Sequence, residues 1–327
     1  MSFQSKIFQL AKDTEHPEQC QDAFGIDPAR AIAVVADGVA SAIFSRRWAE
    51  ILTESVAAEP PDPDDKEGFA QWLAELRKTW SESIDTSALA WFQKAKLPLG
   101  AFSTLLWIRL SPIEDDGPGT FGAYRLRAFA VGDSCLLHVR HGEILRMFPI
   151  EKSEEFEADP VVLGSVDLNR DALVEFRSID EVCYPDDLLV LCTDAIADWA
   201  LRGIESGNPP SWDRLWEIAG EDWQQEIAEL RGQREMRYDD ATLMLLKVAE
   251  QGVEIGSPEV SCSTGQIGEL PPQHEAASED WKEKLKSASE QVADGLDKAS
   301  GHLARGWKKW KRKAVEKYRE KFNPDDK

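Results

Sequence analysis

The sequence predicts an α+β fold built around antiparallel β-sheets. Short apolar, β-branched runs typical of buried strands recur along the chain. Stretches with helical apolar spacing come in blocks between groups of such runs, and do not alternate with them one by one. Apolar residues make up 42% of the 327 residues, which is enough for a sizeable core.

The first predicted elements are a strand and two helices. Residues 31–37 form a β-branched run that ends in Asp-Gly, and residues 41–57 follow with helical spacing. The segment at 60–65 is rich in proline and aspartate, which predicts a loop that ends at a helix start. From Phe69 to Phe92 the apolar residues recur about every 3.6 residues, which predicts one long amphipathic helix.

A group of strands comes next. Residues 101–110 and 123–134 predict two strands on either side of a loop that contains glycine and proline. Residues 135–148 predict a hairpin that turns at His141-Gly142. The remaining predicted elements are strand 171–179, strand 186–194, helix 195–204, helix 211–230 and strand 241–248.

The composition narrows the classes of function. The chain has 60 acidic and 38 basic residues, so its net charge of −22 is a poor match for nucleic acid. The five cysteines are odd in number and show no CxxC spacing, which argues against a disulfide framework or a structural zinc site. Because no signal-peptide pattern and no uncharged apolar run of about 18 residues is seen, we expect a cytoplasmic protein.

The charge is unevenly distributed and divides the chain. Residues 279–327 hold 14 Lys and Arg against 10 Asp and Glu, whereas the rest is strongly acidic. Between these parts lies a stretch rich in Gly, Ser, Pro and Glu with little periodicity. We expect a folded domain at residues 1–250, a flexible linker at 251–278 and a helical tail at 279–327.

The tail shows one apolar stripe, from Trp281 to Phe322, with a period close to 11 residues in three turns. This pattern predicts a basic amphipathic helix. Such a helix can pack on the chain's own acidic domain, dock on a protein partner, or lie on an anionic membrane surface. The sequence leaves these alternatives open.

Acidic residues stand at the ends of several predicted strands. Asp37, Asp133 and Asp194 each end a strand-like run and precede a small residue, and Asp239 stands just before the last strand. Carboxylates gathered at a sheet rim repel one another unless a cation neutralises them, and oxygen-only ligands favour Mg²⁺ or Mn²⁺. Taken singly, each acid also fits a helix cap or a turn.

Six blocks, in order over roughly residues 10–250, resemble the metal-dependent protein phosphatases, the type 2C Ser/Thr family, in its bacterial form. They are CQDAFGI (20–26), AVVADGV (33–39), GAFSTLLWIRL (100–110), AVGDSCLLHVRHGEI (130–144), DDLLVLCTDAIADW (186–199) and YDDATLMLL (238–246). The resemblance implies a four-layer αββα sandwich of two antiparallel sheets flanked by helices. It makes residues 1–250 the catalytic domain.

The resemblance also implies a site for two Mn²⁺ or Mg²⁺ ions. Asp37 would bridge the ions, and the Gly38 carbonyl would be a second ligand. Asp194 and Asp239 would bind one of the ions, and Asp22 would act through metal-bound water. Asp37, Asp194 and Asp239 are the expected catalytic residues.

The implied activity is hydrolysis of phosphoserine and phosphothreonine in a phosphoprotein, either a Ser/Thr kinase or its target, in signalling. Two ions about 3.5–4 Å apart would activate a water that attacks phosphorus. Asp133 matches the acid that goes with a weaker third ion in bacterial relatives.

Some positions depart from the family pattern. Gln21 stands where the family has an acid, and the family's phosphate-binding Arg and a nearby His are absent. Arg46 and Arg47 follow on the predicted helix as possible phosphate contacts, or as ordinary surface cations. We therefore also consider an alternative function, a weak or inactive phosphatase-fold module that docks a kinase or regulator.

Overall fold

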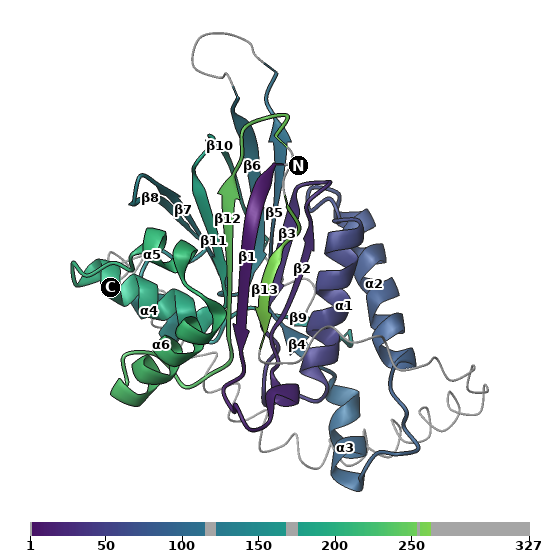
Figure 1. Ribbon diagram of the computed structural model, residues 1–327. Helices are drawn as coiled ribbons and strands as arrows, with labels where there is room; N and C mark the ends of the chain where they lie inside the picture. Colours follow the sequence, from purple (N-terminus) through teal and green to yellow (C-terminus); the bar gives the residue numbers. More distant parts are fainter. Residues whose placement is uncertain (1, 115–121, 168–175, 254–255, 263–327) are drawn as a thin grey trace, which may run out of the picture. The chain divides into compact units, whose positions relative to one another are not determined.

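The computed structural model describes residues 2–114, 122–167, 176–253 and 256–262. Two sheets, antiparallel except for the β13–β1 pair, dominate this part of the chain (Figure 1). The six-stranded sheet runs in the order β13 (Glu259–Cys262), β1 (Phe3–Leu10), β12 (Ala241–Val248), β11 (Leu188–Cys192), β7 (Cys135–Arg140), β8 (Glu143–Phe148). The five-stranded sheet runs in the order β10 (Arg177–Cys183), β6 (Tyr124–Val131), β5 (Leu105–Pro112), β3 (Ile32–Ala36), β2 (Ala23–Asp27).

The helices fall into two groups, one on each outer face (Figure 1). The first group is α1 (Ser45–Ala58) and α2 (Lys66–Glu82), followed by the short α3 (Trp91–Lys96). The second group is α4 (Asp194–Glu205), α5 (Trp212–Glu217) and α6 (Gly220–Gln233). Three short 3₁₀ helices and a two-stranded ladder complete the described elements: η1 (Pro17–Gln19), η2 (Leu97–Leu99), η3 (Ser153–Glu157), and β4 (Phe102–Ser103) with β9 (Leu163–Gly164).

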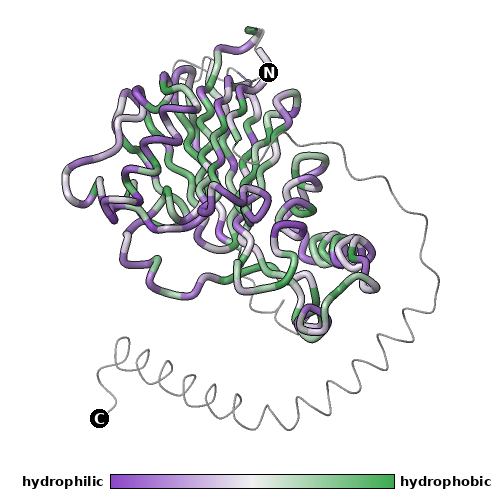
Figure 2. Tube along the Cα trace, turned by 60° about the horizontal axis from the view of Figure 1, so that its bottom comes forward, coloured by the Kyte–Doolittle hydropathy of each residue, from purple (hydrophilic) through white to green (hydrophobic). Residues whose placement is uncertain are grey.

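Three buried apolar clusters correspond to the three interfaces between layers. One lies between the sheets and includes Ile7, Leu106 and Leu189. A second joins the five-stranded sheet to α1 and α2 through Trp48, and a third joins the six-stranded sheet to α4 and α6. Figure 2 shows the hydrophobic segments concentrated along the strands. The predicted four-layer αββα sandwich is confirmed.

The predicted hairpin is confirmed at the predicted turn. β7 and β8 pair antiparallel and are joined by His141 and Gly142, both with positive φ (51° and 79°). Two consecutive residues of positive φ give a two-residue turn whose twist matches that of the strands.

The long helix predicted from Phe69 to Phe92 is wrong. The helix α2 ends at Glu82, and a separate helix begins at Trp91. Beyond the helix end, Ser83 Oγ donates to the carbonyl of Trp80, and the Asp85 carboxylate accepts from the Ser87 amide. Such side-chain bonds to the nearby backbone compete with helix formation.

The stretch predicted as linker, residues 251–278, contains a strand. β13 pairs in parallel with β1, from Lys6 opposite Glu259 to Gln9 opposite Cys262. The strand β1 would otherwise be the sheet edge, with unpaired backbone groups that attract another strand. The described residues between 2 and 262 all belong to one compact unit. The predicted tail at 279–327 lies outside the described residues.

None of the helices in the described ranges combines the length and the apolarity that crossing a membrane requires.

Candidate metal centre

Strand pairing in the five-stranded sheet places two of the predicted acids side by side. Ala23 of β2 pairs with Ala36 of β3. Asp22 and Asp37 are therefore the next residues outward at this end of the two strands. The antiparallel pairing of β2 and β3 therefore places the carboxylates of Asp22 and Asp37 at the same end of the sheet.

Strand pairing in the six-stranded sheet brings two further acids, Asp133 and Asp194, to one sheet end. Cys135 at the start of β7 pairs with Cys192 at the end of β11. Asp133 precedes one cysteine by two residues, and Asp194 follows the other by two residues. The antiparallel register therefore brings Asp133 and Asp194 to the same end of this sheet.

A third pairing adds Asp239 together with a cation. Leu10 of β1 pairs with Ala241 of β12, and Lys12 and Asp239 lie two residues beyond these positions. Lys12 Nζ lies 3.2 Å from Asp239 Oδ1. The neighbouring Asp240 has a different role, because it is buried and accepts backbone N–H groups from Lys12 (2.8 Å) and Gln21 (2.7 Å). Asp240 fixes the backbone, while Asp239 stays partly exposed at the site.

Asp22 links the two sheets and has an unused oxygen. Its Oδ2 accepts hydrogen bonds from the hydroxyls of Thr193 (2.9 Å), which directly follows β11, and Thr242 (2.8 Å) in β12 of the six-stranded sheet. Its Oδ1 is buried and makes no hydrogen bond to any residue that the structure describes. A buried carboxylate oxygen without a partner is costly, so this atom indicates a missing ligand such as water on a cation.

The backbone around Asp37 is held rigidly. Its N–H donates to Thr104 Oγ1 (3.0 Å), and its carbonyl accepts from the Thr104 N–H (2.9 Å). Gly38 is packed so closely that an added Cβ would lie 2.7 Å from the carbonyl oxygen of Gln21. Because glycine has no Cβ, the backbone at Gly38 can lie in contact with the backbone at Gln21, next to Asp22.

Asp194 begins α4 and is paired with an arginine. Arg237 Nη1 lies 3.2 Å from Asp194 Oδ2. The same guanidinium donates through Nε to Asp198 Oδ2 (3.0 Å) and through Nη2 to the Phe156 carbonyl (3.3 Å). Several groups therefore hold Arg237 in place.

The acids strongly perturb one another's ionisation. Burial raises the pKa of Asp37 well above its usual range, and the charges of Asp22, Asp194, Asp133 and Asp239 raise it further. Burial and the neighbouring Asp240 likewise raise the pKa of Asp22. A carboxylate whose pKa is raised by four others indicates that all five share one electrostatic site.

Asp133 and Asp194 show the same perturbation in a milder form. Burial, together with the charge of Asp194, raises the pKa of Asp133 to about 7. Burial and Asp239 raise the pKa of Asp194, and the guanidinium of Arg237 acts in the opposite direction on both acids. The described site thus carries more negative charge than its own cations neutralise.

This donor set fits a hard divalent cation. The candidate ligands are oxygens, Asp22 Oδ1 lacks a partner, and the raised pKa values reflect charge repulsion that a cation would remove. In the described ranges, no three His, Cys, Asp or Glu side chains are yet drawn together as a closed set of metal ligands. An ion held by these acids would therefore need their side chains to approach one another more closely.

Arg46 and Arg47 are engaged on the surface of α1. Arg46 Nε lies 2.9 Å from Glu50 Oε1, and Arg47 Nη1 lies 3.3 Å from Glu50 Oε2 and 3.7 Å from a Glu54 oxygen. Arg46 also donates to the Glu18 carbonyl (3.1 Å), and its amide donates to Gln21 Oε1 (3.2 Å). Arg46 therefore contacts the segment that leads to Asp22, and its predicted phosphate contact stays a prediction.

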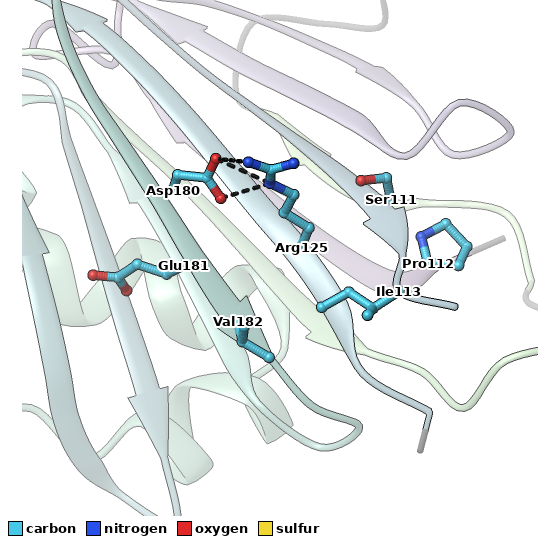
Figure 3. Close-up of a pocket in the computed structure, with 7 residues that line it drawn as sticks. All are labelled: Ser111, Pro112, Ile113, Arg125, Asp180, Glu181 and Val182. Carbon is cyan, nitrogen blue, oxygen red and sulfur yellow. Dashed lines mark hydrogen bonds and ion pairs between the residues drawn. The ribbon is translucent and has the colours of Figure 1, made fainter. Parts of the chain in front are cut away.

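A separate cavity of about 400 Å³ contains none of the predicted site residues (Figure 3). Its wall includes Arg125, whose Nε lies 2.8 and 2.9 Å from the two carboxylate oxygens of Asp180 and whose Nη2 lies 2.5 Å from one of them. Because Arg125 is near the start of β6 and Asp133 follows its end, this cavity is displaced along the strand from the acids.

Sequence analysis missed two cations that pair with acids of the site, Lys12 and Arg237. A signal was present for Arg237, which stands two residues before Asp239 and directly before a block already singled out, residues 238–246. Lys12 gave no such signal, because its place depends on the pairing of β1 with β12. The threonines that anchor Asp22 were missed for the same reason.

Several solved structures are similar to the described fold at low sequence identity. PppA, a key regulatory component of T6SS in Pseudomonas aeruginosa, is 14% identical, with a TM-score of 0.48, covering 76% of this chain and 98% of that one. Stp1, a serine/threonine phosphatase from Staphylococcus aureus, is 16% identical, with a TM-score of 0.46, covering 76% and 95%. The catalytic domain of the phosphatase PstP, solved with two manganese ions, is 16% identical, with a TM-score of 0.45, covering 76% and 99%.

The family model of protein phosphatase 2C matches residues 14–234, more than half of the chain. The chain therefore belongs to the protein phosphatase 2C family, as its sequence blocks predicted. Among curated proteins, none matches it by sequence.

Proposed function

We propose that the protein is an active Mn²⁺- or Mg²⁺-dependent phosphoserine/phosphothreonine protein phosphatase. The observation that carries this proposal is the set of carboxylates from both sheets that meet at one sheet end and raise one another's pKa. Such a set is stable as carboxylates only with cations beside it.

The residues of this chain have separate roles in the proposed reaction. Asp37, the Gly38 carbonyl, Asp194 and Asp239 would hold two ions, and Asp22 would hold water beside them through its Oδ1, which has no partner among the described residues. The bound ions supply an activated water and neutralise charge on the phosphoryl oxygens. The chain itself orients these groups, because Thr104 fixes the backbone of Asp37.

The proposed substrate is a phosphoprotein, either a Ser/Thr kinase or a kinase target. The predicted cytoplasmic location accords with such a substrate. The tail at 279–327 is proposed to contact a protein partner or an anionic membrane surface. Co-sedimentation of the full-length chain, and of a chain lacking 279–327, with anionic and neutral liposomes separates these two.

The test is phosphate release by the full-length chain from p-nitrophenyl phosphate and a phosphothreonine peptide. Turnover is expected with Mn²⁺ or Mg²⁺ and not with chelator, and Asp194→Asn should abolish it. Asp180→Asn is the matched control, because it makes the same change at the cavity of Figure 3. Equal turnover with Asp194→Asn would contradict the proposal.

One observation favours the alternative, a phosphatase-fold module that docks a kinase or regulator. Lys12 and Arg237 already pair with Asp239 and Asp194, two of the proposed metal ligands. A folded protein that binds Mn²⁺ and yet releases no phosphate from either substrate would support this alternative.

A further inference from the structure

Asp133 and Asp194 already have a positive charge fixed beside them. The register of β7 and β11 brings the two acids to one sheet end, and Arg237 Nη1 lies 3.2 Å from Asp194 Oδ2. Asp133 lies at this same end of the sheet, two residues before the cysteine that pairs with Cys192. The guanidinium on Asp194 therefore stands at the sheet end that both carboxylates share.

Arg237 is anchored on three further sides. Its Nε donates to Asp198 Oδ2 (3.0 Å), its Nη2 donates to the Phe156 carbonyl (3.3 Å), and the guanidinium lies 5.4 Å from the centre of the Phe156 ring. Asp198 is itself buried and is held from the other side by Arg202 Nε (2.9 Å). A guanidinium bound at several points keeps its position more firmly than a single ion pair does.

Lys12 differs from Arg237 in this respect. Its ammonium is held by one carboxylate, Asp239, at the end of a flexible stem that is 31% exposed. An arriving ion can displace such a contact at little cost, because a partly exposed pair contributes only about 0–1 kcal/mol. Arg237 instead stays in place when Asp194 receives an ion, since a carboxylate has lone pairs for both partners.

We propose that Arg237 is the permanent cation of the Asp133–Asp194 pair, so that this pair takes no metal ion of its own. The inference rests on the proposed function and deepens it: the loaded site holds two divalent ions, and the weaker third ion predicted with Asp133 is replaced by Arg237. Arg237 is a positioning residue that sets the orientation of Asp194 and the number of ions bound.

The physical reason is charge balance. One guanidinium supplies one positive charge to two carboxylates that are close together, and a divalent ion placed between them would meet that charge directly. Removing the guanidinium charge frees the carboxylates and creates a site with oxygen ligands only, which suits Mn²⁺. Arg237 therefore controls whether an additional ion can bind.

Calorimetric titration of the full-length, metal-free chain with Mn²⁺ tests the inference through stoichiometry. The natural chain should bind two ions. Arg237→Gln, which removes the charge and keeps a polar side chain, should bind three, and adding Asp133→Asn should return the number to two. Arg202→Gln is the matched control, because it removes the other arginine of Asp198, and it should leave the number at two.

Each outcome separates the inference from the proposed function. If the natural chain binds three ions, or if Arg237→Gln binds two, the inference is overturned while the metal-dependent site stands. If the natural chain binds no Mn²⁺, both are contradicted.

Two further variants cover the case in which Arg237→Gln does not fold. Arg237→Lys keeps the positive charge and should bind two ions. Asp133→Asn alone should also bind two ions. A third ion bound by Arg237→Lys, or the loss of an ion from Asp133→Asn, overturns the inference.

Discussion

One aspartate lies just beyond each end of the strand β11: Asp187, which is buried, and Asp194, which is partly exposed. The charges around the two carboxylates are opposite. Asp187 stands just before the strand and Asp194 just after it. Asp187 accepts hydrogen bonds from Arg140 Nε (2.6 Å), Arg140 Nη2 (2.8 Å) and the Tyr184 amide (2.8 Å), and His138 Nε2 lies 2.9 Å away. Asp194 has one arginine partner and stands among other acids.

The pKa values express this difference. Burial would raise the pKa of Asp187, but the hydrogen bonds from Arg140 and His138 hold it at about 2. Burial and neighbouring acids raise the pKa of Asp194, Asp37 and Asp133. The Asp187 end is complete without a ligand, whereas the Asp194 end requires additional positive charge. Burial alone is therefore weak evidence that a carboxylate belongs to a functional site. Burial of a carboxylate that lacks enough hydrogen-bond donors or cations beside it is strong evidence.

The largest expected difference between the two ends concerns activity. Asp37→Asn should lower the rate of phosphate release at least about 100-fold, because it removes a proposed ligand of both ions. In chelator, the same change should leave the free energy of unfolding equal or higher, since it relieves repulsion among the acids. Kinetics and urea unfolding of the same samples measure both. Loss of activity together with a large loss of stability in chelator would contradict this account.

The Asp187 end should respond in the opposite way. Asp187→Asn should lower the free energy of unfolding by about 2–4 kcal/mol, because His138 and Arg140 lose a charged partner. The rate per folded molecule should be unchanged, since β11 separates this end from the site. Urea unfolding measures the stability of the variant, and phosphate release measures its rate. An Asp187→Asn variant that is as stable as the natural chain but inactive would contradict the contrast between the two ends of β11.

The dependence of stability on pH should also differ between the ends. Asp133 has a pKa of about 7 in the folded chain and about 3.9 when unfolded, so in chelator the free energy of unfolding should fall as pH rises from about 4 to 7. The expected fall between pH 5 and 8 is about 1–3 kcal/mol, and Asp133→Asn should reduce it.

Asp187 contributes in the opposite direction. Its folded pKa of about 2 is below the unfolded value, so its stabilisation is complete above about pH 4 and is lost as pH falls toward 2. Asp187→Asn should flatten the acid limb of the unfolding profile and leave the slope between pH 5 and 8 unaltered. An unaltered acid limb would contradict the assigned role of Asp187.

The smallest expected effect is at Lys12. Lys12→Gln removes a cation that competes with an ion for Asp239, so Mn²⁺ should bind up to about 5-fold more tightly, matching a pair worth about 0–1 kcal/mol. Lys78→Gln is a matched control, because Lys78 pairs with Glu82 (3.8 Å) on α2. Calorimetry measures both, and weaker Mn²⁺ binding by Lys12→Gln would show that Lys12 supports the ion.

Local patterns in the sequence predicted much of the fold. The hairpin at His141-Gly142 and the last strand, residues 241–248, could be predicted because turn chemistry and apolar runs are local properties. The strand β1 was missed because buried and exposed residues do not alternate cleanly along it. The helix end at Glu82 was missed because side-chain hydrogen bonds of Ser83 and Asp85 overrode the apolar spacing.

The site was predictable in its acids and not in their partners. Asp37, Asp133 and Asp194 end apolar runs, and this position alone places them at a sheet rim. The roles of Lys12 and Arg237 depend on contacts between segments far apart in the chain, and such pairing cannot be read from a local pattern. The same holds for Asp240, whose two backbone bonds distinguish it from Asp239.

The most direct test of the contrast is thermal unfolding of the natural chain, Asp194→Asn and Asp187→Asn, each in Mn²⁺ and in chelator. Mn²⁺ at about 100 times its dissociation constant should stabilise the natural chain by about 2.7 kcal/mol, and Asp187→Asn by the same amount from a lower starting point. Asp194→Asn should gain much less. An equal gain for Asp194→Asn, or no gain for the natural chain, would contradict the claim that the Asp194 end binds metal and the Asp187 end does not.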